Sequence, residues 1–76
     1  MTFDRLTPQQ KVVATLLMEG YGVHSIARNL HWPRRTVKHY LTQMYNLYGI
    51  TDGVKEVKLA VALTYERKPE LIPWTL

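Results

Sequence analysis

The sequence contains no cysteine, and only four prolines and four glycines among its 76 residues. Without thiols it has no disulfide framework, no thiolate zinc site and no thiol nucleophile, so packing must stabilise the fold. It also lacks an apolar run long enough to span a bilayer, and its first residues lack the basic and continuous apolar regions of a secretory signal. We therefore expect one small cytoplasmic domain over residues 1–68, followed by a proline-containing apolar tail over residues 69–76.

A second absence is that of acidic residues between Gly20 and Thr51. This acid-free window contains four of the ten Lys and Arg residues and all three histidines, whereas the other six Lys and Arg are balanced by six Asp and Glu. The formal net charge of +4 therefore belongs to the window alone. Charge segregated in this way attracts polyanions over roughly the Debye length. The window thus predicts a surface that faces a polyanion.

Helical periodicity and capping signals predict four helices. Thr7, Pro8 and Gln10 have the form of a capping box at a helix start, and Gly49 is suited to a left-handed stop. Pro33 disfavours helical geometry at the residue before it and is suited to open the next helix. We expect helices at about residues 8–19, 23–30, 33–48 and 53–66. The predicted fold class is all-α, with a helix-turn-helix motif formed by the second and third helices.

The helix predicted at residues 33–48 has one apolar face, and its opposite flank is cationic and polar. In helix-turn-helix proteins the second helix of the motif enters the major groove of DNA, and its N-terminal half meets base edges. The residues expected to read bases are Lys38, His39 and Thr42. Those expected to contact phosphates are Arg34, Arg35, Thr36, Arg28 and Asn46. The sequence thus predicts a partner in double-stranded DNA.

A set of motifs runs through most of the chain at a fixed spacing. These are Leu6-Thr7, Gly20, Ile26-Ala27 with Leu30, Thr36-Val37-Lys38, and Leu47-Tyr48-Gly49-Ile50. With this spacing, residues 6–60 resemble the LuxR/GerE-type DNA-binding domain of bacterial transcription regulators. The resemblance implies a four-helix fold and sequence-specific operator binding, usually as a homodimer that forms through the fourth helix. We expect such a dimer to occupy an inverted-repeat operator.

Several positions depart from the residues usual in that family, among them Pro33, Tyr40 and Gly53-Val54, and three of the departures remove an acidic residue. Ser25 and Arg34 stand where the family commonly has acidic residues, and Gln10 stands where it usually has Glu. Because Ser25 and Arg34 replace acidic residues, the surface expected to face DNA is more cationic here than is usual in that family. We therefore expect strong nonspecific affinity for duplexes as well as a specific site.

The helix predicted at residues 53–66 is apolar over much of its circumference. One assignment turns five residues toward the core: Val54, Val57, Ala60, Val61 and Thr64. It leaves Leu59, Ala62 and Leu63 without an intramolecular partner, so these residues, with Trp74 of the tail, are the predicted dimer or partner interface. A competing hypothesis makes the chain an adaptor, which would bind another regulator or the transcription machinery through this helix and the tail.

Other chemistries find less support in the sequence. Tyr40, Tyr45 and Tyr48 are candidates for base stacking, but their helical spacing favours packing in or beside the core. His24 and His31 lack a supporting cysteine or carboxylate, so no metal site and no cofactor is expected. No nucleophile has an arranged base and acid beside it, so we expect no enzyme activity. Trp32 is expected to pack under the turn between the two motif helices.

Overall fold

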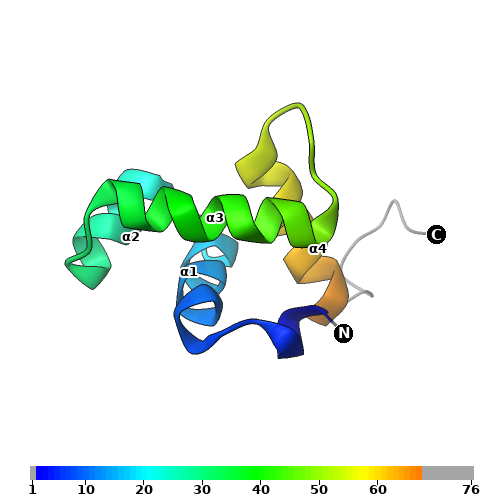
Figure 1. Cartoon of the computed structure of the whole chain (residues 1–76), viewed down its shortest axis with the longest axis horizontal. Coiled ribbons are helices and arrows are strands. Elements are labelled where there is room, and N and C mark those ends of the chain that lie inside the picture. The colour runs from blue at the N-terminus through cyan, green and yellow to red at the C-terminus, as the bar shows by residue number, and fades with distance from the viewer. Residues whose placement is uncertain (1, 68–76) are drawn as a thin grey trace.

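The computed structural model describes residues 2–67 and consists of helices (Figure 1). A short 3-10 helix, η1 (Thr2–Arg5), precedes four α-helices: α1 (Pro8–Met18), α2 (Val23–Leu30), α3 (Arg34–Tyr48) and α4 (Lys55–Arg67). The predicted all-α class with four α-helices is confirmed, whereas η1 was not predicted and α4 begins two residues later than expected. None of the helices in this range is long and apolar enough to cross a membrane.

The longest helix, α3, runs along the long axis of the molecule and the other helices pack around it (Figure 1). It contacts α1, α2 and α4, and α1 also contacts α4. The core between them is apolar, and its buried members are Leu6, Val13, Ala14, Leu17, Ile26, Ala27, Val37, Leu41, Met44, Leu59 and Leu63. The inward face predicted for the third helix is thus confirmed at Val37, Leu41 and Met44.

The start of α1 is the predicted capping box. Thr7 Oγ1 accepts from the Gln10 backbone N–H at 3.2 Å, and Gln10 Oε1 accepts from the Thr7 backbone N–H at 3.0 Å. Two amide groups at the helix N-terminus thereby gain partners within the chain. The same exchange holds the Gln10 side chain in a fixed orientation, and only 8% of that residue's surface is exposed.

Three helices end in the same way, with one residue in the left-handed conformation. These residues are Gly20 (φ 98°), His31 (φ 58°) and Gly49 (φ 70°). In each case the next residue donates its N–H to the carbonyl five positions earlier: Tyr21 to Leu16 (3.1 Å), Trp32 to Ala27 (3.0 Å) and Ile50 to Tyr45 (2.9 Å). This is the Schellman pattern, in which glycine usually occupies the left-handed position. The turn between α2 and α3 therefore begins at His31, directly after the predicted end of the second helix at residue 30.

The structure contradicts part of the orientation predicted for α4, although Ala60 packs against the core as expected. Leu59 and Leu63 are fully buried in the core, whereas Val54 and Val57 are 67% and 59% exposed. The two leucines lie one turn apart and fill the space beside α1 and α3, where their larger side chains bury more apolar surface than the valines would. The prediction that Leu59 and Leu63 form an interface is therefore wrong. Ala62 is half-buried, and Trp74 lies outside the described residues.

A carboxylate of α4 joins the two ends of the described chain. Glu66 Oε2 accepts from the Tyr48 hydroxyl at 2.6 Å and from the Phe3 backbone N–H at 3.2 Å. Burial raises the pKa of Tyr48 well above its usual value, and the hydrogen bond to the Glu66 carboxylate raises it further. This junction attaches η1 and the C-terminal end of α3 to α4.

Candidate nucleic-acid interface

The outward face of α3 carries most of the side chains predicted to contact DNA. Arg35, Thr42 and Asn46 are exposed, and their spacing of seven and then four residues places them on one line along the helix. Lys38 and His39 are also exposed and lie on either side of that line. The three predicted base-reading residues therefore share one open face, and Arg35 lies nearer its middle than the sequence suggested.

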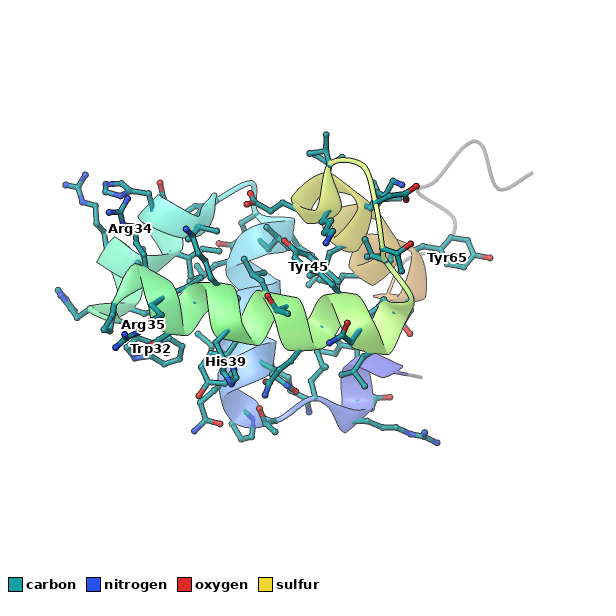
Figure 2. All side chains as sticks on the ribbon, turned by 45° about the horizontal axis from the view of Figure 1, so that its top comes forward. Trp32, Arg34, Arg35, His39, Tyr45 and Tyr65 are labelled. Atoms are coloured by element: carbon teal, nitrogen blue, oxygen red, sulfur yellow. The ribbon has the colours of Figure 1, made fainter. Side chains whose placement is uncertain are left out.

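The N-terminal end of α3 combines positive charge with open backbone donors. Arg34 and Arg35 project from this end (Figure 2), and Arg28 of α2 is also exposed. Pro33 is the cap residue and provides no side-chain hydrogen bond. The Thr36 N–H donates to the Pro33 carbonyl at 3.0 Å, so the amides of Arg34 and Arg35 are the first-turn donors open to an anion. Of the residues predicted to contact phosphate, Thr36 is the one that is half-buried.

The turn before α3 is supported by an aromatic pair. Trp32 is half-buried against the core, as predicted, and its ring centroid lies 5.7 Å from that of Tyr40 with the planes tilted by 45°. Figure 2 shows Trp32 close to Arg35 at this end of α3 and His39 farther along the helix. The packed indole therefore holds the turn in place while the arginines project from the surface.

The comparison with known families agrees with this geometry. Residues 4–60 match the family described as bacterial regulatory proteins, luxR family. The chain belongs to the LuxR family. This makes it a DNA-binding regulator in the general sense, with the helix-turn-helix formed by α2 and α3, and the regulators of this family are not enzymes. No curated protein and no solved structure matches the chain closely enough to add to this.

In this LuxR-family chain, one acidic residue comes closer to α3 than the sequence indicated. Glu56, from the first turn of α4, lines a hollow of about 250 Å³ together with Lys38, Thr42 and Tyr45. Burial raises the pKa of Tyr45 above its usual value, and repulsion from the Glu56 carboxylate adds to the effect. The window that is acid-free in the sequence is therefore flanked by a carboxylate in space. No local signal in the sequence identifies which turn of α4 lies beside Lys38.

A second feature that the sequence did not reveal is a hydrogen-bonded chain behind His39. Gln10 Nε2 donates to Gln43 Oε1 at 2.9 Å, and Gln43 Nε2 lies 3.2 Å from His39 Nε2. Together with the bond from the Thr7 amide, these contacts form what we call the amide relay (Thr7, Gln10, Gln43, His39). The i, i+4 spacing of His39 and Gln43 was visible in the sequence, but the contact to Gln10 spans 33 residues.

The positions of the tyrosines on α3 favour the simpler interpretation. Tyr40, Tyr45 and Tyr48 are half-buried and pack against the core, which supports their assignment as core-edge residues. Within residues 2–67, no three His, Cys, Asp or Glu side chains gather in a way that would hold a metal ion.

Proposed function

We propose that the chain is a sequence-specific, double-stranded DNA-binding transcription regulator that inserts α3 into the major groove. The observation that supports this best is the exposed face of α3, where Lys38, His39 and Thr42 stand together without an acidic residue on the helix itself. A helix of this diameter fits the major groove, and donors and acceptors at these positions meet base edges there.

The side chains divide into two roles. Lys38 donates to guanine O6 and N7, His39 offers one ring nitrogen, and Thr42 offers a hydroxyl together with a methyl group for thymine. Arg28, Arg34 and Asn46 lie toward the edges or ends of this face and contact phosphates. Arg35 contacts phosphate near the open N-terminus of α3, where the backbone amides add to the attraction.

We further propose that the protein binds as a homodimer through the outer face of α4. Val57 and Val61 form an apolar ridge with a hollow on each side, one of about 490 Å³ toward Tyr48 and Tyr65 and one of about 240 Å³ toward the end of α1. A ridge flanked by grooves is the shape that a second helix packs against. Two copies related by a twofold axis would present two α3 helices to an inverted-repeat operator.

DNA specificity is tested by selection from a random duplex library, followed by affinity measurements on the selected site and on a scrambled duplex. Lys38→Ala is expected to weaken the selected site by about 1–3 kcal/mol while affecting the scrambled duplex less. Arg35→Ala is expected to weaken both duplexes by similar factors. The matched control is Arg5→Ala, which removes one exposed positive charge from η1, beside α4 rather than on α3. Equal losses for Lys38→Ala and Arg5→Ala would contradict the proposed interface.

Salt dependence provides an independent test. The logarithm of affinity is expected to fall linearly with the logarithm of salt concentration, with a slope of about −0.9 for each phosphate neutralised. Arg35→Ala should make that slope less steep by about one phosphate equivalent. Binding that does not depend on salt would exclude the proposed mode of binding.

The dimer is tested by charging the ridge. Val57→Glu places a carboxylate on the outer face of α4, and Val12→Glu makes the same change on an exposed valine of α1. The first variant is expected to be a monomer by light scattering and to lose preference for inverted repeats, while the second behaves as the wild type. A wild-type chain that is monomeric both free and on DNA would contradict the dimer, and would favour the adaptor hypothesis for the apolar face of α4.

A further inference from the structure

The amide relay has a direction that follows from its first member. The Thr7 backbone N–H is only a donor, so Gln10 must present its carbonyl oxygen to it. The Gln10 NH2 group then points to Gln43 Oε1, and the Gln43 NH2 group points to His39 Nε2. An NH2 group can only donate, so His39 Nε2 must accept with a free lone pair. The neutral imidazole consequently carries its hydrogen on Nδ1.

Neither side-chain amide of the relay can rotate by half a turn without losing a hydrogen bond. Rotating Gln43 by half a turn would place its NH2 group against that of Gln10, and rotating Gln10 would place its NH2 group against the Thr7 N–H. Gln10 is buried and Gln43 is half-buried, so a donor left without an acceptor there is destabilising. The backbone of the α1 cap thus determines the hydrogen-bonding state of an exposed ring on α3.

We propose that the amide relay sets the base preference of His39, with Gln10 and Gln43 acting as positioning residues. With Nε2 occupied by Gln43, the polar atom that His39 has left for DNA is the Nδ1–H donor. A donor in the major groove selects acceptor atoms: N7 or O6 of guanine, N7 of adenine or O4 of thymine. It does not pair with the amino group of cytosine. The base preference rests on the proposed function, whereas the state of the ring does not.

The state of the ring is measured on the free protein by two-bond proton–nitrogen correlation NMR with labelled histidine, at about pH 8.5, where an imidazole of ordinary pKa is neutral. The isolated histidine side chain favours the Nε2–H form in water. His39 is expected to show the Nδ1–H pattern instead. His24 and His31 provide internal controls because neither belongs to the relay, and loss of one signal in His39→Ala assigns the spectrum.

Gln10→Glu is expected to reverse the relay while keeping the fold. Glu is the usual residue at this position of a capping box, and its charge is favourable at a helix N-terminus. Its two oxygens accept from the Thr7 N–H and from the Gln43 NH2 group, so Gln43 presents its oxygen to His39. The ring must then change to the Nε2–H form. Gln43→Glu is expected to give the same change without altering the cap.

The DNA measurement uses the operator from the random-library selection and its variants at each base. At the position that responds to His39→Ala, the wild type is expected to favour an acceptor base over cytosine by between about 2-fold and about 10-fold, the size of one hydrogen bond. Gln10→Glu should abolish or invert that ratio and leave the ratios read by Lys38 unchanged.

The outcomes separate the relay from the interface. The relay is overturned if the His39 ring of the wild type is in the Nε2–H form, or if that ring keeps its form in both Gln10→Glu and Gln43→Glu. This conclusion does not depend on the DNA-binding measurements. A switched ring with an unchanged base ratio overturns the proposal that the ring state sets the base preference of His39. Failure of the wild type to bind any duplex would overturn the proposed function, while the NMR result on the relay would still stand.

Discussion

Replacing His31 with glycine should stabilise the domain, because His31 holds a conformation that suits glycine better. Its backbone lies at φ 58° and ψ 37°, at the same point of the helix-ending pattern that Gly20 and Gly49 occupy after α1 and α3. The left-handed conformation costs an L-residue about 1–2 kcal/mol, and histidine tolerates it better than most residues. The imidazole is exposed, so the substitution removes no buried contact.

The stability gained by relieving the left-handed backbone is partly offset, because the more flexible glycine loses about 0.5–1 kcal/mol more in backbone entropy on folding. We therefore expect His31→Gly to raise the free energy of unfolding by about 0.5–1 kcal/mol, which corresponds to roughly 2–8 °C in Tm for a domain of this size. Urea and thermal unfolding followed by circular dichroism would measure the change.

His31→Ala is the matched variant, because it removes the imidazole and keeps a Cβ in the left-handed region. It is expected to leave stability unchanged or slightly lower. If His31→Gly were no more stable than His31→Ala, the backbone argument would be refuted, and the side chain of His31 would have to account for any effect.

Three further predictions concern the core and the helix ends. Leu63→Ala should lower the free energy of unfolding by about 2–5 kcal/mol, whereas Val54→Ala should change it by less than about 0.5 kcal/mol, because Leu63 is buried and Val54 is exposed. Urea titrations that gave the opposite order would favour the orientation predicted from the sequence. Thr7→Ala should cost about 1 kcal/mol through loss of the α1 cap, and an unchanged urea midpoint would mean that solvent replaces the cap. The pKa of Tyr48 is raised above its usual 10.0 in the folded chain, so folding favours the protonated hydroxyl. The contribution of this hydroxyl to the free energy of unfolding is therefore fully present below about pH 10 and is lost as the pH rises above it. Tyr48→Phe should therefore flatten the alkaline loss of stability, leaving the smaller share that comes from the raised pKa of Tyr45, and an unchanged pH profile would contradict the assignment.

The elements that the sequence predicted well are those set by local chemistry. The cap at Thr7 and the stop at Gly49 depend on residues within a few positions, so α1 and α3 begin and end within a residue of the expectation. The inward face of α3 was equally clear, because polar residues occupy its other side. The exposed positions of Lys38, His39 and Thr42 followed from that same division.

The features that the sequence did not reveal depend on which elements meet. A helix as apolar as α4 has two faces that satisfy the same periodicity, and only the space beside α1 and α3 selects Leu59 and Leu63 over the valines. The approach of Glu56 to Lys38 and the contact of Gln10 with Gln43 likewise join segments that are 18 and 33 residues apart in the chain. Periodicity carries no information at that range.

The junction at Glu66 has a practical consequence for experiments that attach something to this protein. The Glu66 carboxylate accepts from both the Phe3 backbone N–H and the Tyr48 hydroxyl, so it links the N-terminal segment to the C-terminal end of α3. A fluorophore, an affinity tag or a surface linker joined to the N-terminal segment would therefore lie close to the hydrogen bond that links α4 to the C-terminal end of α3. Measurements of duplex affinity made with such attachments need a counterpart in which the linker leaves the molecule elsewhere.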